Sequence, residues 1–415
     1  MDKQSEPERI AALVHPAPLA PLRELPFVSC WISGALSSSA NWMLSLSVPF
    51  LVYELTSSTT WLGIAAVASN APSIVASPMG GLWADRYSKR VVLLVSIAIQ
   101  ITIALALYLT SASGQLTASR LILLAAAMGF ASSTHLSAYQ AFIGEIVPIE
   151  QIAPAYRLSA IQFNLSRAIG PAVAGFVLAQ WGPSIAFLVN AVGYLPLAGV
   201  LLFIRSHPLP RSEARGVLAE LSEGARVAWL DPRLRRALVT TTVTATFGMS
   251  IYPLIAGLAK DVFQVGEQGL GLMVSSIGAA SVVTAIGVVW LGDALRRSPM
   301  VRIGLVLYGI GLWVVASTTE FSVGVLGFAI TGLAHVLVNV SVTTSVQIHV
   351  ASELRGRVTS LQLMSIIVSM PIGAQLGGLL AEAIGLSAVV ALYGTMLVAY
   401  SAWAQLRMDR LHDLD

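Results

Sequence analysis

The feature that most constrains this sequence is a series of apolar stretches, each about as long as a helix that crosses a bilayer. Such a helix needs roughly 20 mainly apolar residues. Because backbone polar groups in a bilayer must be hydrogen-bonded within the segment, the pattern predicts an all-α integral membrane protein with twelve transmembrane helices. The predicted helices are 27–53, 60–83, 90–111, 118–142, 156–180, 183–204, 234–259, 268–292, 299–318, 321–349, 357–382 and 384–406.

Composition agrees with a membrane protein and excludes several other classes. The 415 residues are 56% hydrophobic and only 11% charged, whereas a soluble domain has about 25% charged residues. The single cysteine excludes an internal disulfide. Neither metal-ligand spacing nor a phosphate-binding Gly-x-x-x-x-Gly-Lys-(Ser/Thr) loop occurs, so we expect no metal, no cofactor and no direct coupling to ATP. The net charge of +3 has a topological explanation, and we expect no nucleic-acid partner.

The distribution of basic residues predicts the orientation in the membrane. Of the 24 Lys and Arg residues, 21 fall in the tails and loops on one side of the twelve-helix arrangement or within a few residues of the adjoining helix ends. Cytoplasmic loops collect Lys and Arg, so both termini are predicted to be cytoplasmic, in a cytoplasmic (inner) membrane. Residues 1–26 and 407–415 are then cytoplasmic tails, and the first apolar stretch is a retained helix because no cleavage site follows it.

The two halves of the chain resemble each other. Helix-breaking and small residues recur at a nearly constant offset of 203 to 208 positions, which predicts two six-helix bundles of the same topology, 27–204 and 234–406. Residues 205–233 would connect the bundles and contain an amphipathic interfacial helix. The matching pairs are Pro49 and Pro253, Gly63 and Gly271, Asp85 and Asp293, Gly170 and Gly373, and Gly182 and Gly385.

A short charged hairpin lies between the second and third predicted helices. It contains Gly81, Asp85, Arg86, Lys89 and Arg90, with four charges in six residues. Charges at this point require an aqueous interface, and Gly81 would allow two helices to approach closely. The simplest interpretation is a basic topogenic loop.

The hairpin also resembles the signature loop Gly-x-x-x-Asp-Arg-x-x-(Arg/Lys)-Arg of the major facilitator superfamily, although Ser88 stands where Gly is frequent. The resemblance implies two bundles that alternate in access to a midplane site, with the Asp and Arg latching the halves in one conformation. Asp293 and Arg296 form a degenerate second copy, or a further topogenic loop. Residues 354–358 and 221–236 extend the resemblance to the branch of enterobactin-type exporters and drug-efflux-like transporters.

The fifth predicted helix contains Asn164, Arg167, Gly170, Pro171 and Gly175. The Gly-Pro part resembles the antiporter motif of the superfamily, which favours export, although the same residues also serve packing. Arg167 lies about 16 Å into the helix, and no Asp or Glu is expected at its depth. Two hypotheses follow: Arg167 contacts an anionic or polar substrate, or it has a structural or coupling role.

Polar residues of the other predicted helices complete the candidate site. In the resembled family helices 1, 4, 7 and 10 line the cavity, and an imidazole there could carry a proton. Each of these side chains could equally form an interhelical hydrogen bond. The candidates for substrate contact or coupling are Asn41, His135, Tyr139, Thr246, His335 and Asn339.

The sequence thus predicts a monomeric secondary active transporter that exports a drug, siderophore or metabolite, with protons as the exchanged ion. Alternatives on the same fold are uptake and lysophospholipid flipping. A non-transporting receptor and a membrane enzyme are less favoured, because no catalytic constellation occurs at one interface.

Overall fold

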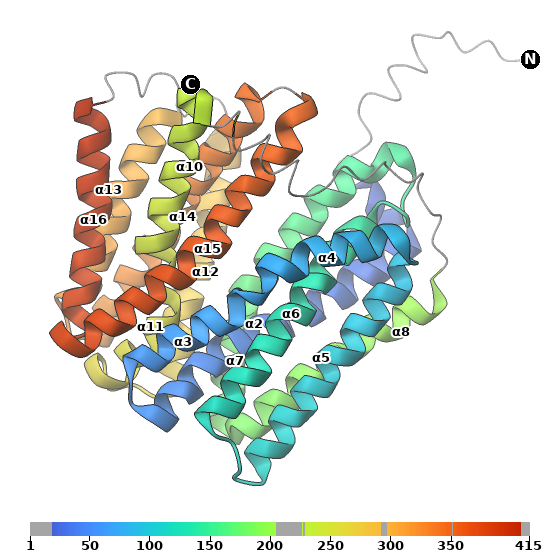
Figure 1. Ribbon diagram of the computed structural model, residues 1–415, viewed down its shortest axis with the longest axis horizontal. Coiled ribbons are helices and arrows are strands. Elements are labelled where there is room, and N and C mark those ends of the chain that lie inside the picture. The colour runs from blue at the N-terminus through green and yellow to red at the C-terminus, as the bar shows by residue number, and fades with distance from the viewer. Residues whose placement is uncertain (1–18, 205–225, 227–228, 292–296, 351, 408–415) are drawn as a thin grey trace, which may run out of the picture.

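The computed structural model describes residues 19–204, 226, 229–291, 297–350 and 352–407, and every regular element in these ranges is a helix (Figure 1). Most of the predicted tails, residues 1–18 and 408–415, and most of the predicted connection 205–233 lie outside the described residues. In chain order the helices of the first half are η1 (Ala20–Arg23), α2 (Leu25–Thr56), α3 (Thr59–Asn70), α4 (Pro72–Arg86), α5 (Lys89–Ala112), α6 (Ala118–Ile143), η2 (Ile149–Gln151), α7 (Ile152–Gly193) and α8 (Leu195–Phe203). Those of the second half are α10 (Pro232–Thr244), η3 (Ala245–Met249), α11 (Ile251–Gly257), η4 (Leu258–Val262), α12 (Glu267–Leu291), α13 (Arg297–Ala316), α14 (Phe321–His349), α15 (Ser352–Ile384) and α16 (Leu386–Arg407).

The predicted membrane-spanning helices are present, and the all-α membrane fold is confirmed. By length and composition, the described residues contain 11 helices that could cross a membrane. Residues 173–203 count as one of these helices. That segment includes Gly182, which is non-helical with φ 76° and ψ 178°. A positive φ of this kind is accessible to glycine and strained for other residues. The chain therefore bends at Gly182, which separates the predicted helices 156–180 and 183–204.

Local sequence explains where individual helices start and break. Ser58 caps α3 by accepting a hydrogen bond from the backbone of Trp61, and Thr117 caps α6 in the same way through Arg120. Pro72, which has no N–H to donate, begins α4 and interrupts the second membrane-spanning helix. The first helix of the second half is widened twice into π-helix, in η3 and η4. Such bulges are frequently associated with functional sites.

Two helical bundles make up the molecule, and they are related by an internal repeat. Gly385 matches Gly182 both in sequence and in its positive φ of 87°. Gly170 of α7 packs against Trp42 and Ser39 of α2, and Gly373 of α15 packs against Thr246 and Ser250 of the helix that begins the second half. Equivalent helices therefore cross at equivalent glycines, as the offset in the sequence predicts.

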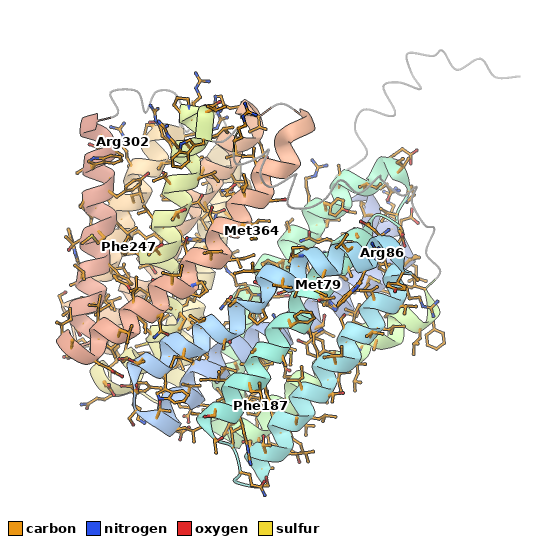
Figure 2. The ribbon with its side chains drawn as sticks, in the orientation of Figure 1. Met79, Arg86, Phe187, Phe247, Arg302 and Met364 are labelled. Carbon is orange, nitrogen blue, oxygen red and sulfur yellow. The ribbon has the colours of Figure 1, made fainter. Side chains whose placement is uncertain are left out.

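The bundles touch at one end and diverge towards the other. Helices α3, α11 and α15 meet where α2 ends and α3 begins, whereas the far ends of the bundles are separated (Figure 1). Arg86 and Arg302 lie at these separated ends (Figure 2). We call the contacting end the closed end; it includes Tyr53, Ser58–Thr60, Asp261 and Glu382.

At two symmetry-related positions, helices of the two bundles cross at a glycine, whose lack of a side chain allows the contact at the closed end. A Cβ atom on Gly271 of α12 would lie 2.9 Å from the Cα of Gly175 in α7. A Cβ atom on Gly63 of α3 would lie 2.6 Å from the Cα of Gln375 in α15. Real Cβ atoms do not approach backbone so closely, so glycine permits both crossings. The landmarks Gly63 and Gly271 are thus explained by the junction between the bundles.

Candidate functional site

A cavity of about 320 Å³ lies between the bundles, beside the closed end. A volume in this range suits a small organic ligand. The first half contributes residues of α2, α3, α4, α6 and α7, and the second half contributes residues of η3, α11, α12 and α15. The lining consists of Asn41, Trp42, Leu44, Ser45, Leu46, Val48, Pro49, Ala65, Ala66, Ser69, Asn70, Ser73, Ala125, Met128, Gly129, Ser132, Ser133, Arg167, Pro171, Met249, Tyr252, Pro253, Ala256, Leu270, Val274, Gly278 and Met370.

Arg167 is the electrostatic centre of the cavity. It is the only Arg, Lys, Asp, Glu or His in the described lining. Within the described part of the chain its guanidinium makes no hydrogen bond or ion pair. An arginine in a membrane-spanning helix is costly unless it faces a partner or a water-filled cavity. The cavity is therefore what accommodates this charge in the described conformation.

The polar candidates predicted from the sequence are not all in the cavity. Asn41 lines it, and its side-chain oxygen accepts a hydrogen bond from Tyr194 at 3.5 Å. His135 lies inside the first bundle, 3.3 Å from the Ser96 hydroxyl and stacked on Tyr139. Tyr139 donates to the backbone oxygen of Cys30 at 3.0 Å. In the described conformation these two side chains therefore contact groups of their own bundle and not the cavity.

The three candidates from the second half also lie outside the lining. Thr246 donates to the carbonyl oxygen of Thr242 in its own helix at 2.8 Å. His335 is buried, with its ring edge-on to Tyr308. Asn339 is half-buried in α14, and this helix contributes nothing to the described lining. The expected set of cavity helices is thus incomplete, because α3, α4, α7, α12 and α15 also reach the cavity.

Several cavity residues were missed in the sequence. Ser69, Asn70 and Ser73 flank the break between α3 and α4, and Ser132 and Ser133 face them from α6. A small-polar cluster around a helix-breaking proline was the available signal. It is weak, because serine is common at helix–helix contacts in membranes.

The helix 5 motif divides between the cavity and the bundle contacts. Pro171 lines the cavity beside Arg167. Gly170 crosses α2, and Gly175 crosses α12 with a hypothetical Cβ 2.7 Å from the Cα of Gly271. The side chain of Asn164 lies outside the described residues. The motif therefore places Arg167 at the cavity by close packing on both sides of its helix.

The closed end is held by carboxylates that reach across the two bundles. Tyr53 of α2 donates to Asp261 of η4, and the ammonium of Lys260 lies 5.8 Å from the Tyr53 ring centre. Glu382 of α15 accepts from the Ser58 hydroxyl at 2.5 Å and from the Thr60 amide at 3.2 Å. Hydrogen bonds to ionised carboxylates are stronger than neutral ones. These bonds supplement the glycine crossings in keeping this end shut.

The signature hairpin is tied to its own bundle. The Lys89 ammonium and the Glu145 carboxylate form an ion pair at 2.5 Å, and Arg90 donates to the backbone oxygens of Leu202 and Ile204 at the end of α8. Asp85 and Arg86 are exposed. In the described residues no hydrogen bond or ion pair of this hairpin crosses to the second bundle, because the bundles are separated at this end.

Two further predictions concern a close helix crossing at Gly81 and the second copy of the hairpin. A Cβ atom on Gly81 would meet no atom within 4 Å, so Gly81 is not a close crossing here. The neighbouring Gly80 takes that role, since its Cβ would lie 2.9 Å from the Cα of Thr134 in α6. The second copy, Asp293 and Arg296, lies outside the described residues. A latch between the hairpin and the second bundle stays a prediction for another conformation.

We expect the Lys89–Glu145 pair to be important for stability. The side chains are only 14% and 5% exposed, so removing one partner leaves a buried charge unpaired. Lys89→Met should lower the unfolding free energy by roughly 3–5 kcal/mol. Thermal unfolding in detergent measures the change, and Lys89→Met/Glu145→Leu is the matched double variant. A double variant as unstable as the single one would contradict a charge-pairing role.

Two bundles of six membrane-spanning helices, closed at one end around a shared cavity, define a transporter of the major facilitator superfamily. The chain belongs to the transmembrane secretion effector family, which it matches over residues 16–415. This membership, with a cavity that lies between bundles, identifies a transporter and not an enzyme.

Individual relatives agree with this assignment. An uncharacterised transporter of the same superfamily, YfiS of Bacillus subtilis, is 26% identical over 88% of this chain and 89% of its own length. The multidrug efflux pump Tap of Mycobacterium tuberculosis is 25% identical over 92% of both chains. A bacterial homologue of the human lysosomal transporter Spinster, solved in an inward-facing conformation, superposes with a TM-score of 0.70 at 13% identity, covering 94% of this chain and 96% of its own. At that identity the last likeness concerns the fold alone.

Proposed function

We propose that this protein is a monomeric secondary active exporter of a small molecule in the cytoplasmic membrane, driven by proton antiport. The observation that carries the proposal is the cavity between two bundles whose described helices meet at one end and diverge towards the other. Both termini are assigned to the cytoplasm from the distribution of Lys and Arg. The separated ends then face the cytoplasm. Ligand would enter the cavity from the cytoplasm and would be released outside when the closed end opens.

Export is favoured over uptake by two arguments. The Gly-Pro motif of α7 resembles that of antiporters and positions Arg167 between two helix crossings. Tap, which aligns over 92% of this chain, is named as an efflux pump. In the absence of a carboxylate from the described lining, His135 and His335 are the proposed proton carriers. Replacing either one with Gln should then alter the pH dependence of transport.

A second candidate is proton-linked uptake, in which Arg167 binds an anionic ligand at the cavity and His335 carries the proton. A proton on His335 would add a second positive charge, which Arg167 would repel. An anionic ligand at Arg167 would reduce this repulsion, so anion and proton would bind together. Joint binding is the sign expected for symport, and the direction of proton movement separates the two functions.

The test uses everted membrane vesicles that contain the full chain. With an acid-inside gradient, addition of an exported compound should dissipate the gradient under antiport. Asp85→Asn should abolish the response if the signature hairpin latches another conformation, and the empty-vector membrane is the control. Ligand-dependent acidification of the vesicle interior would instead favour symport. Absence of any proton flux in vesicles that contain folded protein would contradict transport coupled to protons.

A further inference from the structure

We propose that the ligand of the central cavity is an amphipathic organic anion, whose carboxylate or phosphate-type oxygens bind the guanidinium of Arg167. The inference rests on the proposed transport function and names the substrate class. It is carried by the charge, the hydrogen-bonding state and the shape of the lining.

The first observation is the unbalanced charge of the cavity. Arg167 faces the cavity with no hydrogen bond or ion pair within the described ranges, and the described lining contains no Asp or Glu. Guanidinium offers several N–H donors in a planar fork that fits a carboxylate or phosphate in a bidentate manner. A ligand anion is the group that would complete this site.

The second observation is that three serine hydroxyl groups of the same lining are already used as donors. Ser132 and Ser133 donate to the carbonyl oxygens of Met128 and Gly129 in α6 at 2.6 and 2.8 Å. Ser73 likewise donates to the carbonyl oxygen of Asn70 at 2.5 Å. A hydroxyl that donates to its own helix keeps lone pairs as acceptors. These serines therefore suit hydroxyl or amide donors on the ligand.

The third observation is the apolar remainder of the lining. Met128, Met249 and Met370 come from three different helices, and the rings of Trp42 and Tyr252 complete the surface. Methionine adapts its shape to irregular ligands, and aromatic rings supply large contact areas. A small, rigid and fully polar anion would leave this surface unused, so an amphipathic body is inferred.

The same arrangement disfavours cationic amphiphiles. A cation in a cavity of about 320 Å³ would come close to Arg167 without an acidic group to offset the repulsion. The inference thus separates this chain from transporters whose cavities contain a carboxylate. It also explains why Arg167 occupies this depth of the membrane without a hydrogen-bond or ion-pair partner among the described residues.

Equilibrium binding tests this without requiring transport. Full-length protein in nanodiscs of uncharged phosphatidylcholine is titrated calorimetrically with three probes of one shape: 2-naphthylacetate, 2-(2-naphthyl)ethanol and 2-(2-naphthyl)ethylammonium. We expect the carboxylate to bind roughly 10- to 100-fold more tightly than the ammonium, as charge-assisted hydrogen bonding predicts. Arg167→Gln should remove this difference and Arg167→Lys should retain part of it, while thermal unfolding verifies that each variant is folded.

A charge-matched control and a second ligand source sharpen the result. Arg120 is exposed, lies outside the cavity and donates to the Gln115 carbonyl, so Arg120→Gln should keep the preference for the anion. Lysophosphatidylglycerol, with lysophosphatidylcholine as reference, tests an anion delivered from the membrane. Arg167-dependent binding of naphthylacetate supports an aqueous anion, and Arg167-dependent binding of the lysolipid alone supports a membrane-derived one.

Three outcomes would overturn the inference: equal binding of all three naphthyl probes, tighter binding of the ammonium, or no binding of any probe to folded protein. Anion binding that persists in Arg167→Gln would do the same. Failure of the proposed function is separate, because an anion that binds through Arg167 and yet drives no flux in vesicles would leave the binding site established and the transport proposal wrong.

Discussion

Cross-linking the closed end is expected to arrest transport completely. Ser58 and Glu382 belong to different bundles, and their side-chain oxygens are 2.5 Å apart. A short bis-methanethiosulfonate reagent, which forms a reducible disulfide with each of the thiols of Ser58→Cys and Glu382→Cys and releases methanesulfinate, would hold this end shut and prevent the cavity from opening there. Transport in vesicles is measured before cross-linking, after it, and after reduction, which should restore it.

The chain provides a clean background for this experiment. Its only cysteine, Cys30, is buried in the first bundle, so a Cys30→Ser background removes the one competing thiol. Each single-cysteine variant, treated with the same reagent, controls for modification alone. Full activity in quantitatively cross-linked protein would show that the closed end does not need to open.

Replacement of Gly271 by valine should have the second large effect. The first side-chain atom at this position would lie 2.9 Å from the Cα of Gly175 and 3.4 Å from the carbonyl oxygen of Pro171. Because both contacts are with backbone, the helices must move apart. Overpacking of this kind costs roughly 1–3 kcal/mol. If it falls on the closed state alone, the equilibrium between closed and open states shifts by about 5- to 150-fold.

The same helix offers a matched control. A Cβ on Gly287 of α12 would meet no atom within 4 Å, so Gly287→Val adds the same apolar groups without a clash. Reactivity of a single cysteine at Ser58 reports opening of the closed end, and vesicle flux reports transport. Gly271→Val should raise the first and lower the second, whereas Gly287→Val should change neither. Equal behaviour of the two variants would contradict the role of the crossing.

The fold could largely be predicted from the sequence, because each membrane helix must satisfy its own backbone hydrogen bonds and is therefore encoded locally. The turn between the fifth and sixth helices was marked by Gly182, whose positive φ only glycine adopts without strain. The repeat was equally readable, since Gly63 and Gly271 must stay glycine wherever two backbones cross.

The site was predicted only in part. Arg167 was identified because an unpaired charge at mid-membrane depth requires an explanation, and the structure places it in the cavity lining. His135 and His335 are polar groups of the same kind in the sequence, yet their hydrogen-bond and ring partners lie within single bundles. Spacing along a helix indicates which residues share a face, but it does not say which neighbour covers that face.

What the sequence determined by itself is the set of helices, their turns, the twofold repeat and the presence of one charge inside a membrane helix. Helices and turns depend on residues close together in the chain, and the repeat is visible when the sequence is compared with itself. Only the tertiary structure decided that Tyr53 meets Asp261 and that Ser58 meets Glu382, 208 and 324 positions away. It also decided that the serines of α6 face the break before Pro72 across a common cavity. These relations depend on how two bundles lie against each other, and no local pattern specifies that arrangement.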